Sequence, residues 1–304
     1  MSESWSITRR EFLHKAVLSS AGLGLWSLTT NAASPRVRFG VVTDSHYANR
    51  DPLNNRFYRQ APQRMQEFVD VMNREKVDFV VHLGDFKDED SRKRPQDTLQ
   101  YLKHLEDIYA GFQGPRYHCV GNHDVDSITK EQFLENVVNS QISGYQSYYS
   151  YNNNGFHFVV LDANYHADGR DQFYKEGADW QDPNIPDVQL QWLKDDLLAA
   201  SGPTVVFIHH PLFAYQREQY RFHVHQSEQV RQILEDSAQV LAVFQGHVHD
   251  EHHQFINGIH YYTQHAMVEF DGLDNNSFSM VEVNAKSITI NGYKRVATKT
   301  YSIK

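Results

Sequence analysis

A short apolar run ends in a polar turn at residues 117–124, which read Tyr117-His118-Cys119-Val120-Gly121-Asn122-His123-Asp124. Four further apolar runs end in side chains of the same kinds, and they give Asp44-x-His46, Gly84-Asp85-x-x-Asp88, His209-His210 and Gly246-His247-x-His249. In open α/β sheets, binding sites form beyond the carboxyl ends of the strands. The five turns are therefore expected to converge on one crevice, where Asp, His and Asn side chains suit manganese, iron or zinc.

Each of these patterns also has an ordinary explanation. An Asp-x-His pair is common in loops, and two histidines in alternate positions fall on one face of a strand by chance. The Gly121-Asn122-His123-Asp124 turn is the most specific of the five, because a turn needs only one or two of those residue types. All five patterns in order, each after an apolar run, predict a metal site.

Strands and helices alternate in the first two thirds of the chain. Buried strands are expected at 37–43, 77–83, 117–120, 204–208 and 240–244, and helices after Pro62 and at 96–110, 129–138, 188–198 and 226–234. A hairpin is expected at 148–161, and short strands at 255–256, 259–262, 277–283 and 288–290, with turns at Asn257-Gly258 and Asn291-Gly292. This order indicates one α/β domain over residues 36–304, with a mixed sheet or two packed sheets and helices outside.

Composition narrows the possible functions. The chain has 304 residues, a net charge of −9, 18 histidines and one cysteine, Cys119. The negative charge, with no basic tract to balance it, argues against a nucleic-acid coat protein. Many histidines beside one cysteine favour metal binding through imidazole and carboxylate rather than thiolate. Bound cations would also supply local positive charge for a small phosphate substrate.

Residues 1–35 have the features of an export segment. Thr8-Arg9-Arg10-Glu11-Phe12-Leu13 resembles the twin-arginine signal of bacteria, and the uncharged, mildly apolar stretch 16–35 follows it. Small residues precede the domain, so we expect cleavage after Ala32. A retained membrane anchor is the alternative, but polar residues dilute this stretch, so no stable anchor is expected. The resemblance implies a periplasmic or secreted protein that uses the twin-arginine export machinery.

Taken together, the five motifs resemble the calcineurin-like metallophosphoesterase family, whose pattern runs D-x-H, G-D-x-x-D/N, G-N-H-D/E, H, G-H-x-H. The resemblance covers roughly residues 37–249, and all five motifs are intact. It implies a four-layer α/β/β/α sandwich of two mixed sheets flanked by helices. It also implies a phosphoester hydrolase that holds two divalent or trivalent metal ions, manganese, iron or zinc.

Carried over residue by residue, the resemblance implies seven metal ligands and one catalytic residue. One ion is held by Asp44, His46 and His249, the other by Asn122, His209 and His247, and Asp85 bridges both. The metal pair activates a water molecule for in-line attack on phosphorus. His123 protonates the leaving oxygen or stabilises charge there.

The neighbours of these residues receive supporting roles. Asp124 is expected to orient His123, and Asp88 is expected to support its loop. The Fe-tyrosinate relatives carry a tyrosine where this chain has Asp88, so we expect no purple colour. The other histidines are expected to pack or to be exposed, although a supporting role at the site stays open for His252, His253, His260 and His265, and a substrate role for His223 and His225.

Three loops after strand ends, 47–59, 163–186 and 212–225, are candidates for substrate recognition. Their aromatic and arginine side chains are suited to stacking a base and holding a second phosphate, although packing of the loops explains the aromatics equally well. These side chains are Arg50, Arg56, Tyr58, Arg59, Tyr165, Phe173, Tyr174, Trp180, Phe213, Tyr215, Arg217, Tyr220, Arg221 and Phe222.

The loops favour a small phosphodiester or nucleotide-type substrate, either a cyclic nucleotide or an ADP-ribose-like diphosphate. A broad phosphomonoesterase is the alternative within the same enzyme class. A non-catalytic metal- or phosphate-binding protein is a further alternative, and the intact His123 and ligand set argue against it. An amidohydrolase would carry its His-x-His at the first strand of a β/α barrel, which this chain does not show.

Overall fold

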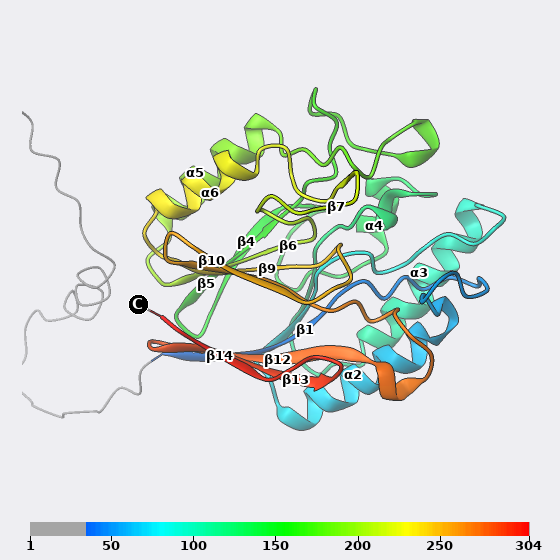
Figure 1. Ribbon diagram of the computed structural model, residues 1–304, viewed down its shortest axis with the longest axis horizontal. Helices are drawn as coiled ribbons and strands as arrows, with labels where there is room; N and C mark the ends of the chain where they lie inside the picture. Colours follow the sequence, from blue (N-terminus) through cyan, green and yellow to red (C-terminus); the bar gives the residue numbers. More distant parts are fainter. Residues whose placement is uncertain (1–34, 304) are drawn as a thin grey trace, which may run out of the picture.

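The computed structural model describes residues 35–303, which form two six-stranded sheets packed face to face with helices on both outer faces (Figure 1). The predicted four-layer α/β/β/α sandwich is therefore confirmed. The twin-arginine motif and the expected cleavage site at Ala32 lie outside the described residues.

The first sheet has the order β14-β13-β12-β1-β2-β3. Strands β1, β2 and β3 run parallel, and β12 continues the sheet antiparallel to β1. Its strands are β1 (Arg36–Val42), β2 (Phe79–His82), β3 (Arg116–His118), β12 (Ser277–Asn284), β13 (Ser287–Lys294) and β14 (Lys299–Ser302).

The second sheet has the order β10-β11-β9-β6-β5-β4. Its four inner strands run parallel, and the edge strands β4 and β10 pair antiparallel with their neighbours. Its strands are β4 (Tyr149–Asn153), β5 (Phe156–Leu161), β6 (Thr204–Ile208), β9 (Val240–Gln245), β10 (His252–Ile256) and β11 (Ile259–Thr263).

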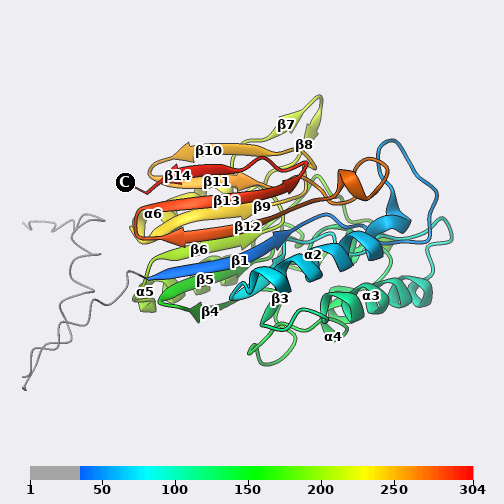
Figure 2. The same ribbon diagram turned by 90° about the horizontal axis from the view of Figure 1, so that it is seen from below.

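Helices cover the outer face of each sheet (Figure 2). Helices α2 (Ala61–Glu75) and α3 (Pro95–Tyr109) pack on the first sheet, and α5 (Asp187–Ala199) and α6 (Ser227–Asp236) pack on the second. The remaining elements are α4 (Lys130–Glu135), the 3₁₀ turns η1 (Tyr58–Gln60), η2 (His123–Val125), η3 (Tyr174–Glu176) and η4 (Leu273–Asn275), and the ribbon β7 (Gln216–Arg217) and β8 (Tyr220–Arg221). Over the described residues, every helix is too short or too polar to cross a bilayer.

Most expected elements are found within a few residues of their predicted positions, and the Asn257-Gly258 turn does join β10 to β11. The predicted turn at Asn291-Gly292 is wrong. Both residues lie inside β13, where Asn291 pairs with Met280 and Gly292 pairs with Ser279 of β12. The long antiparallel partner strand overrides the local turn preference at this position.

Phe39 of β1 lies at the centre of the core between the two sheets. Its ring stacks on Phe79 with centroids 5.0 Å apart, and it meets Phe158, Phe207 and Phe244 of the second sheet edge to face at 5.6–5.8 Å. Edge-to-face aromatic pairs add to the free energy gained by burying the rings. This contact fixes how the strand ends of the two sheets lie relative to each other.

Phe39→Ala should lower the free energy of unfolding by about 3–5 kcal/mol, because the cavity is enclosed by rings from both sheets. Urea unfolding followed by tryptophan fluorescence measures this change. Leu198→Ala on α5 is the matched control, since Leu198 is 86% exposed and its loss should cost less than about 0.5 kcal/mol. Equal effects of the two substitutions would contradict the central role of Phe39.

Candidate metal centre

The seven predicted ligands lie together at the carboxyl ends of five parallel strands. Asp44 and His46 follow β1, Asp85 follows β2, Asn122 follows β3, His209 follows β6, and His247 and His249 follow β9. All seven side chains are buried. The strands come from both sheets, so the centre forms where the two sheets meet at one end of the sandwich.

Asp44, His46 and His249 form the first group. The Asp44 Oδ1 atom lies 3.7 Å from His46 Nε2 and 3.5 Å from His249 Nε2. The two Nε2 atoms are 3.1 Å apart. Ligand atoms of this kind and spacing are suited to holding one metal ion.

Asp85, His209 and His247 form the second group, and Asn122 lies beside them. His209 Nε2 lies 3.2 Å from Asp85 Oδ2 and 3.2 Å from Asn122 Oδ1. The same Asp85 oxygen lies 3.5 Å from His46 Nε2 of the first group. Asp85 therefore lies between the two groups of side chains.

Three of the imidazoles are held by their Nδ1 atoms so that Nε2 faces the centre. His209 Nδ1 donates to the carbonyl of Leu83 at 2.9 Å, and His249 Nδ1 bonds to Glu269 at 2.6 Å. His46 Nδ1 bonds to Asp88 at 3.0 Å. Acceptors on Nδ1 keep the proton there and leave the Nε2 lone pair free, which is the usual arrangement of metal-binding histidines.

The nitrogen and oxygen atoms that face the centre are better placed to bind cations than to hydrogen-bond to one another. Among the described residues, the buried atoms Asp44 Oδ1 and His247 Nε2 have no hydrogen-bond partner. His46 and His249 turn their Nε2 atoms toward each other at 3.1 Å, which is unfavourable unless a proton or a cation lies between them. Buried polar atoms without partners are costly, so these donors indicate metal binding.

Electrostatics support the same conclusion. Burial by itself raises the pKa of Asp85, but His209, His123 and His46 outweigh it and hold that pKa well below its usual range. Burial lowers the pKa of His209, yet the Asp85 carboxylate raises it to about 9. The buried carboxylates therefore draw positive charge to the site, and metal ions compete with these imidazole protons for it.

The backbone at the site is strained. Five of the seven predicted ligands, Asp44, His46, Asp85, His247 and His249, have φ between 48° and 71°. Residues with a Cβ rarely adopt this left-handed region, and it costs free energy of order 1–3 kcal/mol each. Gly121 relieves crowding nearby, because a Cβ there would overlap the backbone nitrogen and the carboxylate of Asp85.

His123 lies at the rim of the centre, with 29% of its side chain exposed. Its Nδ1 lies 3.3 Å from Asp88 and 3.5 Å from Asp126, and its backbone N–H donates to Asp85 at 2.7 Å. Burial lowers the pKa of His123, but the carboxylates of Asp88 and Asp85 raise it well above its usual value. The ring therefore lies at the rim of the centre, beside the carboxylates of Asp88 and Asp126.

The expected role of Asp124 is wrong. Its carboxylate accepts hydrogen bonds from the backbone N–H groups of Phe86, Lys87 and Gly121, and so it joins two turns rather than orienting His123. Asp88 holds both His46 and His123 instead. Sequence neighbours on a 3₁₀ turn point in different directions, and only the fold brings Asp88 to His123.

Several histidines are structural, as expected. His210 is buried beside the site, and burial together with His209 lowers its pKa to about 3. His82 bonds to Ser45, and His118 lies 3.0 Å from Glu106. The structure does not support a role at the metal site for His253 and His260, because they contact each other and Tyr301 at the β10 edge of the second sheet.

Two of the three candidate loops bring aromatic rings to the metal centre. Trp180 lies 6.0 Å from His247 and 5.4 Å from Phe222, measured between ring centroids. Phe222 lies 5.6 Å from His247, and Tyr220 contacts Trp180 at 5.6 Å. These rings form an aromatic wall, Trp180, Tyr220 and Phe222, beside one group of ligands.

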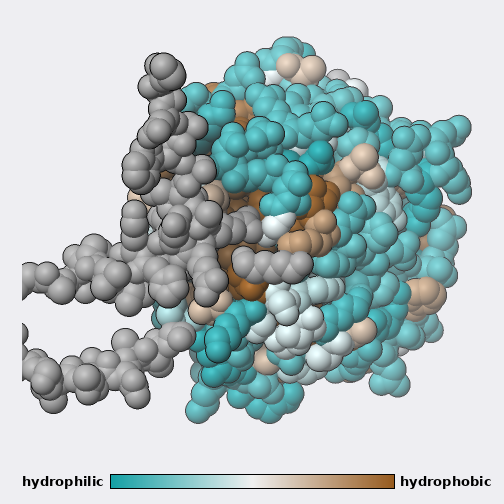
Figure 3. Space-filling view, turned by 60° about the vertical axis from the view of Figure 1, so that its left-hand side comes forward, coloured by the Kyte–Doolittle hydropathy of each residue, from teal (hydrophilic) through white to brown (hydrophobic). Residues whose placement is uncertain are grey.

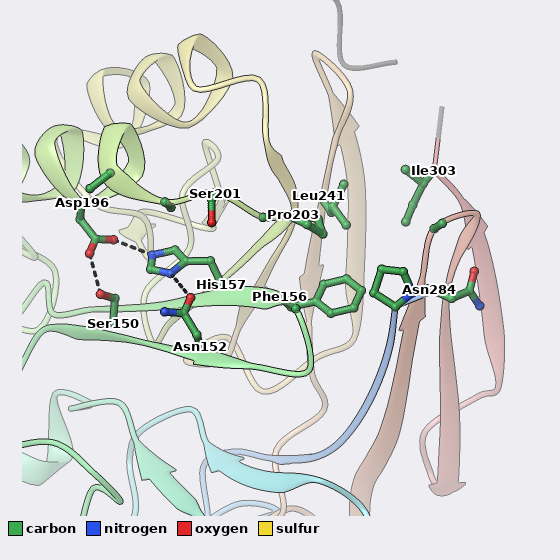
Figure 4. A pocket seen from close by; sticks show the side chains of 16 residues that line it. Ser150, Asn152, Phe156, His157, Asp196, Ser201, Pro203, Leu241, Asn284 and Ile303 are labelled. Atoms are coloured by element: carbon green, nitrogen blue, oxygen red, sulfur yellow. Dashed lines mark hydrogen bonds and ion pairs between the residues drawn. The ribbon is translucent and has the colours of Figure 1, made fainter. Parts of the chain in front are cut away.

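A cavity of about 670 Å³ lies at the opposite end of the sandwich, where apolar residues gather on the surface (Figure 3). Four of its polar side chains bond to one another: His157 bonds to Asn152 and Asp196, and Asp196 accepts from Ser150 (Figure 4). None of the metal-suited clusters among the described residues includes a residue that lines it. The metal centre is therefore the better candidate for chemistry.

Similarity to known proteins agrees with this geometry. A manganese-dependent ADP-ribose/CDP-alcohol diphosphatase of Oryza sativa subsp. japonica is 25% identical over 307 residues, covering 88% of this chain and 94% of that protein. A probable cyclic nucleotide phosphodiesterase of Fibrobacter succinogenes is 22% identical over 220 residues, covering 71% of this chain and 73% of its own. The crystal structure of a dimetal phosphatase from Danio rerio shares the fold, with a TM-score of 0.74 and 20% identity over 88% of this chain and 99% of that one.

The calcineurin-like phosphoesterase family matches residues 37–251, which is well over half of the chain and includes all five motifs. The matched span begins at β1 and ends just after the last metal-suited histidine, His249. The protein therefore belongs to the calcineurin-like phosphoesterase family, and it is a metal-dependent phosphoester hydrolase.

Proposed function

We propose that this enzyme hydrolyses a nucleotide-type substrate, either a diphosphate of the ADP-ribose class or a cyclic nucleotide. The observation that carries this proposal is the aromatic wall, whose Trp180 and Phe222 rings lie 6.0 and 5.6 Å from the ring of His247. A base can stack there while a phosphate lies over the predicted ligands. The names of the rice and Fibrobacter relatives support the same two substrate classes.

In this proposal the seven buried residues hold two metal ions. Asp44, His46 and His249 would hold one, Asn122, His209 and His247 would hold the other, and Asp85 would contribute to both. Bound there, the ions activate a water molecule and neutralise charge on the phosphoryl oxygens. Manganese is favoured by the manganese-dependent relative, and iron and zinc suit the same ligands.

His123 supplies the proton for the leaving group. Its rim position lets the ring reach the substrate, and the carboxylates of Asp88 and Asp126 lie 3.3 and 3.5 Å from Nδ1. When the bond between phosphorus and the leaving oxygen breaks, Nε2 donates its proton to that oxygen. In this proposal Asp88 is a positioning residue, since it bonds to His46 Nδ1 and its carboxylate also lies 3.3 Å from His123 Nδ1.

Asp85→Asn should reduce both bound metal and turnover, because it removes the charge shared by the two groups. The loss of activity should exceed about 100-fold, the upper range for residues that only support a ligand. Protein stripped of metal and reloaded with Mn²⁺ is assayed on bis-p-nitrophenyl phosphate, p-nitrophenyl phosphate, ADP-ribose and cyclic AMP. Asp107→Asn on the exposed side of α3 is the control. Full activity of Asp85→Asn without bound metal would reject the metal-dependent mechanism.

His123→Ala should leave the metal content unchanged and slow turnover by about 10²–10⁴-fold on substrates with poor leaving groups. The loss should be smaller with bis-p-nitrophenyl phosphate, because nitrophenolate leaves without needing a proton. This difference is measured by comparing kcat on cyclic AMP, whose leaving group is a sugar hydroxyl, with kcat on bis-p-nitrophenyl phosphate. His104→Ala on the exposed face of α3 is the control. Equal losses on both would argue against proton donation by His123.

We also propose that residues 1–35 form a twin-arginine export segment that is cleaved near Ala32, so that residues 36–304 act as one domain in the periplasm or outside the cell. Twin-arginine export carries folded proteins, which suits a chain that loads its metals first. Replacing Arg9 and Arg10 together by lysine should keep the full-length protein in the cytoplasm of a bacterial host. Cell fractionation and the mass of the exported protein test this, and undiminished export of the variant would reject it.

A further inference from the structure

A cavity of about 300 Å³ opens beside the metal centre. Two predicted metal ligands, His247 and His249, form part of its lining, together with the ring of Phe222 from the aromatic wall. Three arginines from distant parts of the chain also line it: Arg56, Arg217 and Arg295. The first two lie in loops that the sequence analysis singled out, whereas Arg295 follows β13, beyond the last motif.

The carboxylates of this cavity are already engaged. Asp250 lies 3.1 Å from the Arg217 guanidinium, and Glu269 accepts from His249 at 2.6 Å. Within residues 35–303, Arg56 and Arg295 make no ion pair. Neither guanidinium lies within ion-pair distance of a carboxylate, although Asp250 and Glu269 lie near enough to Arg295 to attract it. Both arginines line a cavity that also borders the predicted metal ligands.

Arg295 is held in a costly environment. Its guanidinium carbon lies 4.2 Å from the centre of the Phe270 ring, and its Nη1 atom is inaccessible to water and has no hydrogen-bond partner among the described residues. Arg64, the other arginine of this region, donates to the carbonyls of Met267, Glu269 and Phe270 and so holds the loop itself. Hydrogen bonds from Arg64 therefore hold this loop without help from Arg295. An anion in the cavity would bind the guanidinium nitrogens of Arg295 other than the enclosed Nη1.

We propose that Arg295, assisted by Arg56, binds the phosphate that is not attacked, and that the enzyme therefore prefers substrates with two linked phosphates over cyclic nucleotides. This inference rests on the proposed function and selects between its two substrate classes. A guanidinium fork matches phosphate oxygens with two parallel hydrogen bonds. The phosphate of a cyclic nucleotide carries one negative charge and has no second group to place in this cavity.

Binding is measured first, because it does not depend on turnover. Calorimetry with Mn²⁺-loaded protein compares α,β-methylene-ADP, whose two phosphates resist hydrolysis between them, with AMP, which has one. Arg295→Gln should weaken binding of α,β-methylene-ADP by about 10- to 100-fold, the range for hydrogen bonds to charged groups, and should weaken AMP binding much less. Arg36→Gln, an exposed arginine outside the cavity, is the matched control.

Kinetics then test selectivity. The ratio of kcat/KM for ADP-ribose to kcat/KM for cyclic AMP should fall by about 10- to 100-fold in Arg295→Gln, mainly through KM, and Arg295→Lys should recover part of it. The proposal is overturned if Arg295→Gln weakens binding of α,β-methylene-ADP and AMP equally, or weakens neither, even when the enzyme is active. Selective loss of α,β-methylene-ADP binding in a protein that hydrolyses no nucleotide supports Arg295 and rejects the proposed function instead.

Discussion

Asp44 and Asp85 are buried among four imidazoles, and this concentration of charge constrains the rest of the structure. Two carboxylates cannot stay ionised in a region of low dielectric unless positive charge lies close to them. In the protein alone that charge comes from protons on His46 and His209, whose pKa values the carboxylates raise against the effect of burial. Metal ions can replace these protons, and the unpartnered atoms Asp44 Oδ1 and His247 Nε2 would then gain partners as well. Burying these side chains therefore costs more free energy when no cation is bound than when metal ions are bound.

Such a site requires a rigid scaffold, because its backbone is strained. Left-handed φ values at five of the predicted ligands persist only where the surrounding structure holds them. Here the strain follows directly after strands that are buried on both faces, and the two sheets are joined across the site by the bond from His209 to the Leu83 carbonyl. The aromatic core around Phe39 fixes the same two sheets at their centre. The geometry of the metal centre therefore depends on how the two sheets pack in the core.

The sequence predicted those features that depend on short-range order. Each ligand follows an apolar strand directly, so the five motifs could be assigned to one crevice before their distances were known. The supporting shell depends on long-range contacts, and it was partly mispredicted. Asp124 was expected at His123, but the structure places Asp88 there, and Glu269 on His249 carried no motif at all. The prediction of a turn at Asn291-Gly292 was wrong for a related reason, because strand pairing with β12 outweighs the turn preference of these two residues.

The location of Arg295 shows how one metal centre can serve different substrates. The motifs end at His249, and the arginine that faces the adjoining cavity follows β13, almost fifty residues later, on the sheet that does not carry His247 and His249. Changes in that turn can alter the charge of the cavity without moving any ligand of the metal centre. The chain as a whole carries a net charge of −9, which repels anionic substrates at long range. Attraction of a phosphate must therefore come from the site itself, and in this proposal the guanidinium groups that line the cavity beside the predicted metal ligands provide it over the short range where salt screens little.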